Sequence, residues 1–224
     1  MRILSPVTAL LAIVAIPLSA ADLSYLDLRL SGGVLSKVYK GSSSATVTDG
    51  NGAVTSTSSS EDGRDADTNW RGQLQLVGGQ LGSAGGLVYG AGIAVNRATW
   101  DNGAQNAHAT TPVVDILLGY GYAFTPSWHV ELTPFAGIGR AYYSVSEGDS
   151  SSTSKDWNGY VEYGAKLATY LTLGGGLQLG LEVPYLVGRF KPEYSHNDGS
   201  NQYEVSDERR NQGFGMLISL GTRF

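Results

Sequence analysis

The chain has 224 residues and a formal net charge of −5, with 31 glycines, 13 tyrosines and no cysteine. Without cysteine it can form neither a disulfide nor a thiolate metal site. It has no basic stripe and its long polar segments are acidic, which excludes a nucleic-acid-binding protein. Beyond the N-terminal segment no apolar run reaches the ~18 residues of a transmembrane helix, and the length suits one large all-β domain.

The N-terminal segment has the parts of a secretory signal peptide. Met1-Arg2 gives a positive start, a mostly apolar stretch follows, and Pro17-Leu-Ser-Ala-Ala21 ends in small residues. We therefore expect residues 1–21 to be cleaved, with cleavage after Ala20 as the alternative, and residues 22–224 to form one domain. A retained membrane anchor competes with this interpretation, but the segment is short for a transmembrane helix.

Alternation with a period of two predicts eight strands in the rest of the chain. They cover residues 25–34, 70–76, 87–96, 114–124, 128–138, 160–167, 177–187 and 213–224. Each has one apolar or aromatic face and one small or charged face, as where Met216 and Ile218 alternate with Ser219. The chain supplies nothing to cover eight apolar faces, so we expect them to face lipid.

The predicted connections alternate in length. The short ones, residues 79–86, 125–127 and 172–176, have glycine or proline turn chemistry. The long polar ones are residues 39–67, 98–110, 144–156 and 188–209. Outer-membrane barrels combine short periplasmic turns with longer extracellular loops. We therefore predict an all-β fold, an eight-stranded antiparallel up-and-down transmembrane β-barrel; a soluble lipocalin-like barrel would need its apolar face inside.

Aromatic residues gather at the predicted strand ends, which indicates two girdles at the lipid headgroups. The long-loop girdle would hold Trp70, Trp100, Tyr142 and Trp157. The short-turn girdle would hold Tyr122, Phe124, Trp128, Tyr170 and Phe224. The alternative is the general preference of aromatic residues for strands.

The run Leu118-Gly-Tyr-Gly-Tyr-Ala-Phe-Thr-Pro-Ser-Trp128 resembles a hairpin of small outer-membrane barrels of the outer-membrane-protein-A and opacity-protein type. The terminal Phe224 on an alternating strand resembles the assembly signal that the barrel-assembly machinery reads. The resemblance implies a Gram-negative outer-membrane location and a cell-surface role. The first long connection is unusually long for this family, and we expect no peptidoglycan-binding domain after the barrel.

The inward faces carry charges of both signs. We expect a lumen charge network of Asp27, Arg29, Arg71, Asp115, Glu131, Glu162, Lys166, Glu182 and Arg223. With a turn centred on Gly174, Lys166 and Glu182 would face each other. Unpaired charges in a narrow lumen are costly, so these residues predict a plugged interior. A narrow porin-like channel for ions or small solutes is the alternative.

Four arginines continue the lipid-facing phase at the long-loop ends of their strands. They are Arg97, Arg140, Arg189 and Arg210. Arginine can reach the interface and bind phosphate with two hydrogen bonds, so we expect contacts with lipopolysaccharide. Ordinary solvation at the base of the loops is the alternative interpretation.

The first long connection, residues 41–67, is rich in serine and acidic residues. Such a segment buries too little apolar surface to order itself, so we expect a mobile hydrated loop. Two more specific functions are the alternatives: an adhesive surface, or weak calcium binding through Asp49, Asp62, Asp65 and Asp67. The spacing matches no complete calcium-loop signature, and we predict no metal or cofactor.

An enzyme that modifies lipid A is the second alternative function. It would need a nucleophile within hydrogen-bond reach of a base. The three histidines, His108, His129 and His196, lack the close serine pairing of lipid A deacylases. We therefore expect a non-enzymatic, monomeric barrel with a structural or surface-interaction role, whose loops contact an extracellular ligand that the sequence does not identify.

Overall fold

The computed structural model describes residues 23–36, 38–62, 65–82, 84–101, 105–147, 157–191, 193–197 and 201–224. The expected signal peptide lies outside the described residues. The strands are β1 (Leu23–Leu35), β2 (Tyr39–Asp49), β3 (Val54–Asp62), β4 (Thr68–Gly82), β5 (Gly85–Asp101), β6 (Gln105–Thr125), β7 (Trp128–Glu147), β8 (Trp157–Thr172), β9 (Leu177–Phe190), β10 (Glu193–Asn197) and β11 (Asn201–Arg223). In the described part of the chain, no helix is long and apolar enough to cross a membrane.

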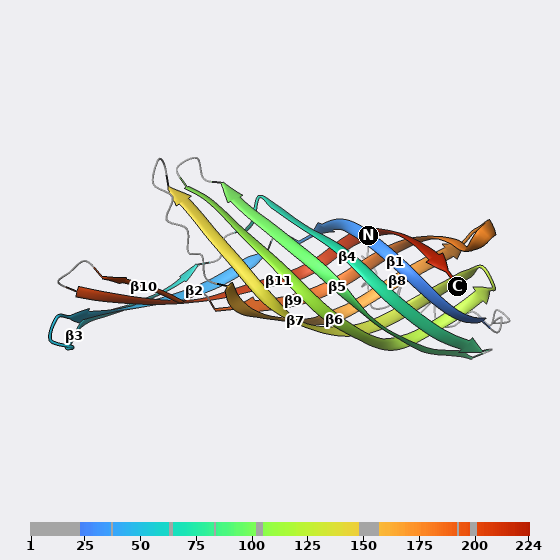
Figure 1. Ribbon diagram of the computed structural model, residues 1–224, viewed down its shortest axis with the longest axis horizontal. Helices are drawn as coiled ribbons and strands as arrows, with labels where there is room; N and C mark the ends of the chain where they lie inside the picture. The colour runs from blue at the N-terminus through green and yellow to red at the C-terminus, as the bar shows by residue number, and fades with distance from the viewer. Residues whose placement is uncertain are drawn as a thin grey trace, which may run out of the picture.

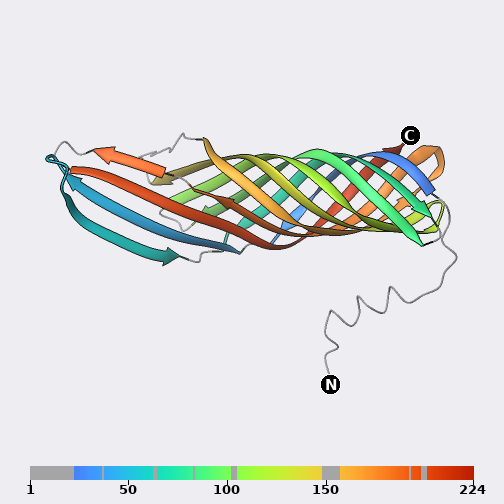
Figure 2. The same cartoon turned by 90° about the horizontal axis from the view of Figure 1, so that it is seen from below.

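Eight of these strands form a closed ring. Their order is β1, β4, β5, β6, β7, β8, β9 and β11, and β11 pairs back onto β1. The closing ladder is antiparallel and runs from the pair Asp27–Arg223 to the pair Leu35–Gly215. Figures 1 and 2 show the strands winding around one axis with a common tilt. The predicted antiparallel eight-stranded barrel is therefore confirmed.

The outer wall is apolar. Large hydrophobic side chains alternate along every ring strand with buried ones, and Leu118, Leu181 and Ile218 are 60%, 43% and 69% exposed. The exposed apolar bands cover residues 87–95 on β5, 128–138 on β7, 177–185 on β9 and 214–224 on β11. These lengths match the ~9–11 residues of a tilted membrane strand. Since nothing in the described chain covers these bands, hydrocarbon is the solvent of the outer wall, and the fold is a transmembrane β-barrel.

The first short connection is shorter than predicted. The β4–β5 ladder continues through the expected loop to the pair Gly82–Gly85, where Gly85 has a φ of +87°. The glycines before it are strand residues: a Cβ on Gly79 would lie 2.4 Å from the ring of Tyr25. Glycine here makes room for a tyrosine in the lumen, so it is not a turn signal.

The turn between β8 and β9 is centred one residue later than predicted. It passes through a short 3₁₀ segment, Gly174–Gly176, with Gly175 at a φ of +75°. The resulting register places Lys166 opposite Pro184, and Glu182 opposite Ala168. The predicted direct facing of Lys166 and Glu182 is therefore wrong, although their side chains still meet diagonally.

The first long connection is ordered, contrary to the expected mobile loop. Residues 39–62 form the hairpin β2–β3, and β2 pairs with the first half of β11 from Asn201–Asp49 to Asn211–Tyr39. Backbone hydrogen bonds to a neighbouring strand order this segment without an apolar core of its own. On the other side of β11, β10 pairs with residues 202–206.

These four strands, in the order β3, β2, β11 and β10, form what we call the extramembrane sheet. The two figures show it continuing along the barrel axis beyond the ends of the other strands. It begins where β1 gives way to β2: the amide of Ser36 donates to the carbonyl of Phe214 at 2.6 Å, and the amide of Gln212 to that of Val38 at 3.2 Å. The wall of the barrel therefore extends into the aqueous phase on one side.

A charge in the middle of the apolar band tests the membrane assignment. We expect Leu118→Arg to destabilise the barrel in lipid vesicles by about 2–4 kcal/mol, because the midplane cannot hydrate the guanidinium. Val54→Arg is the matched control, since Val54 is 63% exposed but lies on the extramembrane sheet, and it should change stability by about 0.5 kcal/mol or less. Urea unfolding in vesicles measures both, and equal effects would contradict the assignment.

Candidate functional site: the lumen and the outer rim

The nine charged residues predicted for the lumen all lie on inward-facing positions of the ring. Eight of them are at most 3% exposed, and Arg223 is half-buried at the end of β11. They include five carboxylates and four cations, drawn from seven of the ring strands. Burial of this kind is tolerated only where charges are paired and hydrogen-bonded, so their contacts decide what the lumen can do.

Arg29 on β1 is the centre of the cluster nearest the short turns. Its guanidinium donates two hydrogen bonds to Glu131, at 2.8 and 2.7 Å, and one to Asp27 at 2.9 Å. Its Nε donates to Gln178 at 3.1 Å. Arg223 reaches the other oxygen of Asp27 at 2.8 Å. One arginine therefore links strands β1, β7 and β9 across the lumen.

Aromatic rings enclose this cluster. The Arg29 guanidinium lies 3.8 Å from the centre of the Tyr170 ring and 5.6 Å from that of Tyr25, a cation–π arrangement. The Tyr25 hydroxyl donates to Glu131 at 2.5 Å, and His129 Nε2 lies 3.0 Å from the same carboxylate oxygen. Tyr170 is fully buried, so its predicted place in the short-turn girdle is wrong. It shares the inward face of β8 with Glu162 and Lys166, and there its ring lies against the guanidinium.

Lys166 and Glu182 form the middle of the lumen. Their Nζ and Oε2 atoms are 3.2 Å apart, and Lys166 also donates to Gln75 at 2.7 Å. Glu182 accepts further hydrogen bonds of 2.8 Å each from Ser31, Gln73 and Tyr170. Both carboxylate oxygens of Glu182 are thus occupied.

Arg71 on β4 is the centre of the third cluster, nearer the long loops. It donates to Asp115 at 2.9 Å and to Glu162 at 2.8 Å. Asn96 accepts from Arg71 at 2.9 Å and donates to Glu162 at 2.9 Å, and the hydroxyl of Tyr160 donates to Glu162 at 3.0 Å. Gln73 joins this cluster to the middle one, because it accepts from Arg71 and donates to Glu182. Tyr170 joins the middle cluster to that of Arg29, because its hydroxyl donates to Glu182 and its ring lies against the guanidinium.

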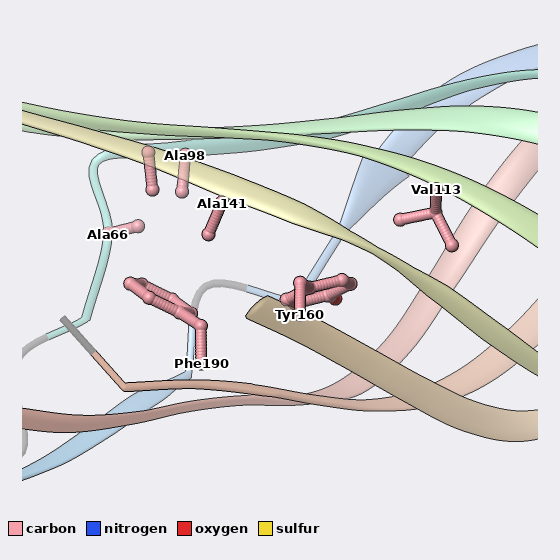
Figure 3. Packing of buried hydrophobic residues seen from close by; sticks show 7 residues of the cluster. Ala66, Ala98, Val113, Ala141, Tyr160 and Phe190 are labelled. Atoms are coloured by element: carbon pink, nitrogen blue, oxygen red, sulfur yellow. The ribbon is translucent and has the colours of Figure 1, made fainter. Parts of the chain in front are cut away.

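Apolar side chains fill the rest of the lumen, which the sequence analysis missed. One cluster, on the side of β4, β5 and β6, contains Leu23, Tyr25, Val77, Leu81, Val88, Leu117 and Ala123. A second lies toward the outer mouth and contains Ala66, Ala98, Ala109, Val113, Ala141, Tyr160 and Phe190 (Figure 3). Pairs of adjacent apolar residues such as Leu117-Leu118 were the available signal, because a strand that is apolar on both faces is buried on one and faces lipid on the other.

The space between the charged groups in the middle of the lumen is small. A cavity of about 10 Å³ lies among Arg71, Gln75, Asp115 and Lys166, which is room for about one water molecule. The lumen therefore resembles the interior of a globular protein, with charged groups paired inside a packed shell.

The four arginines predicted at the outer rim lie just past the apolar bands. Arg97, Arg140 and Arg189 are exposed, and Arg210 is half-buried. Arg97 follows the exposed Val95 by two residues, which keeps it on the outward face of β5. In the described part of the chain none of the four forms an ion pair.

Arg189 and Arg210 are direct cross-strand partners on β9 and β11. The backbone register continues to Lys40 on β2. Like charges directly opposite each other destabilise a sheet unless an anion lies between them. Two positions further out, Lys191 and Glu208 form an exposed ion pair of 3.5 Å, so Glu208 already has a cationic partner.

The described histidines do not form a catalytic arrangement. His129 is buried against Glu131, and His108 lies beside the Tyr142 ring, with 6.2 Å between ring centres. The side chain of His196 lies outside what the structure describes. Among the described residues, no group of three or more histidine or acidic side chains could hold a metal ion. The hydroxyl of Thr169 donates to the backbone carbonyl of His129 at 3.4 Å, but no serine or threonine hydroxyl hydrogen bonds to the ring of a described histidine.

No protein-family model matches the sequence, and no curated protein matches it. Solved structures similar to the chain include the outer-membrane protease OmpT of Escherichia coli, at 12% identity and a TM-score of 0.41, covering 89% of this chain and 97% of that one. The outer-membrane protein OprG of Pseudomonas aeruginosa is 14% identical, with a TM-score of 0.40 and 93% and 99% coverage. The attachment invasion locus protein Ail of Yersinia pestis is 11% identical, with a TM-score of 0.31 and 86% and 99% coverage. The likeness concerns the fold; the membrane assignment rests on the outer wall described above.

Removing the central lumen arginine tests how far the barrel depends on its internal ion pairs. We expect Arg29→Met to lower the free energy of unfolding by about 3–5 kcal/mol, because Glu131 and Asp27 would stay buried without their partner. Arg97→Met, at the exposed rim, should cost about 0.5 kcal/mol or less. Urea unfolding in vesicles measures the difference, and a small effect at Arg29 would show that water replaces the guanidinium.

Proposed function

We propose that this chain is a barrel of a Gram-negative outer membrane, monomeric within its own membrane and with a closed lumen, and that its role is structural or surface interaction. The observation that carries the proposal is the mutual pairing of the lumen charges: the contacts of Arg29, Arg71 and Lys166 lead to other protein groups across the ring. The part left to meet other molecules is the polypeptide beyond the outer rim.

An export and assembly route belongs to the proposal. Residues 1–21 would direct the chain across the inner membrane and be removed, leaving residues 22–224 as the barrel. Phe224 would serve as the signal for the barrel-assembly machinery. It ends the apolar band of β11 at 74% exposure, and its amide donates to Leu26 at 2.9 Å, so the same residue completes the closing ladder.

A narrow channel is the competing proposal, and the packing weighs against it. A path for ions needs charged groups facing water, whereas Glu131 and Glu182 are at most 1% exposed and hydrogen-bonded. The apolar cluster at the outer mouth would add a dry barrier above them. A lipid-modifying activity lacks support in the described residues, because no histidine ring there hydrogen bonds to a serine or threonine hydroxyl.

Planar-bilayer recording tests the closed lumen. We expect the purified full-length protein to give no stable single-channel steps in salt solution, because the paired charges and the packed side chains leave no continuous water path. A barrel-forming control protein of known conductance confirms that the bilayer is competent. Reproducible steps of constant size would refute the proposal in favour of a channel.

We further propose that the rim arginines bind phosphate groups of lipopolysaccharide. Arg189 and Arg210 support this most directly, since two unpaired guanidinium groups on facing positions gain from a shared anion. Arg97 and Arg140 lie at the same boundary on β5 and β7, and would extend the contact around the rim.

Neutralising the facing pair tests this contact. We expect Arg189→Gln with Arg210→Gln to reduce the lipopolysaccharide that stays bound in detergent by about tenfold or more, since a hydrogen bond to a charged group contributes about 1.5–3 kcal/mol. Neutralising Arg97 and Arg140 as well should remove the remainder. Lys191→Gln is the control, because that ammonium is already paired with Glu208. Unchanged binding in the four-fold variant would refute the contact.

A further inference from the structure

The extramembrane sheet has an unprotected edge at β3. In the described part of the chain β3 pairs with β2 alone, so its other side has no neighbouring strand. Figure 2 shows it as the outermost strand of the sheet on that side. Every second residue of an edge strand directs its N–H and C=O away from the sheet, which leaves a template for another strand.

The sequence of β3 lacks the features that usually block such an edge. Val-Thr-Ser-Thr-Ser-Ser-Ser-Glu-Asp, residues 54–62, contains no proline, lysine or arginine, although natural edge strands commonly carry one of these. Residues 54–59 are exposed, and the hydroxyl side chains of residues 55–59 are small enough to let a second backbone approach. Hydroxyl side chains also keep this edge soluble while it is unpaired.

The hairpin holds this edge in a fixed shape. Asp49 caps the β2–β3 turn by accepting from the amides of Asn51 and Ala53, at 2.9 and 2.8 Å. The hydroxyl of Thr55 donates to the carbonyl of Val47 at 3.1 Å. A strand that is ordered before it meets its partner loses little conformational entropy on pairing.

We propose that β3 pairs antiparallel with β3 of a second copy of this chain, and so links two membranes. The inference rests on the proposed surface role and identifies its partner. An isologous contact of this kind needs only one surface, presented identically by both copies. The pairing continues the extramembrane sheet through a two-fold axis into the sheet of the other copy.

The charges of β3 select the antiparallel direction. The strand has two acids, Glu61 and Asp62, and both lie at one end. A parallel, in-register pair would place each acid opposite its own copy, which is destabilising. Antiparallel pairing centred on Ser58, the middle of the strand, places the acids opposite Thr55 and Val54 of the other copy, and joins the two strands over their whole length.

The direction of pairing determines where the two barrels lie. The extramembrane sheet continues along the barrel axis (Figure 1), so β3 runs roughly along the line that leads away from the membrane. A two-fold axis perpendicular to β3 then places the two barrels at opposite ends of the joined sheet. The two copies therefore sit in facing membranes, and the contact would hold two cells or vesicles together.

Single cysteines in the cysteine-free chain test this contact. In the proposed pairing Ser58 faces Ser58 of the other copy, within the ~5.5 Å that separates Cα atoms of facing residues, and this distance suits a disulfide. The two Val54 positions would be about 26 Å apart, at about 3.3 Å per residue. The full-length variants Ser58→Cys and Val54→Cys, both exposed substitutions, would be inserted into two vesicle populations with different lipid dyes and oxidised mildly after mixing.

We expect Ser58→Cys to give a disulfide-linked dimer and Val54→Cys to give none. Both variants should tether the dye-labelled vesicles, because the strand pairing itself does not need the disulfide. Dimers with both variants would indicate parallel pairing within one membrane and overturn the proposal. Absence of dimer and tethering with Ser58→Cys, while the barrel keeps its heat-modifiable gel mobility, would overturn it and leave the closed-lumen barrel intact. A chain that gains no such mobility in vesicles would contradict the proposed function itself.

Discussion

Hydrocarbon offers no hydrogen bonds to a peptide backbone, and this constraint organises the whole molecule. Each backbone N–H and C=O in the membrane needs a partner on a neighbouring strand, so the sheet must close. The ladder between β1 and β11 meets that need. Once the ring is closed, every side chain faces either lipid or the lumen, and the alternation of apolar and polar residues follows from that choice.

The lumen of an eight-stranded barrel is narrow, so the charges buried in it must be paired with one another. Arg29 and Arg71 each link carboxylates from different strands, so the ion pairs connect strands on different sides of the lumen. Such pairs add little net stability over apolar packing, but each is costly to break singly. The surrounding aromatic and aliphatic side chains exclude water, which strengthens the pairs and closes the path across the membrane.

The outer rim is the boundary between the part of the chain that lipid surrounds and the part that water surrounds. Arginines mark the boundary on β5, β7, β9 and β11, and beyond them the wall continues as the extramembrane sheet. This extension has polar faces because water, and no longer lipid, surrounds it. The closed barrel leaves no edge in the membrane, whereas the extramembrane sheet has open edges, so β3 offers a place for an intermolecular contact.

The sequence alone determined the number of ring strands, their order and the face on which each charge lies. An alternation with a period of two is visible in consecutive residues of one strand, and it can be recognised without knowing which strands pair. It could not determine the register, since centring the turn on Gly175 instead of Gly174 moves Lys166 from facing Glu182 to facing Pro184. Nor could it show that the ring of Tyr170 lies against Arg29, or that the serine-rich residues 39–62 are ordered by β11. Those outcomes depend on contacts between residues far apart in the chain, which exist only once the ring has closed.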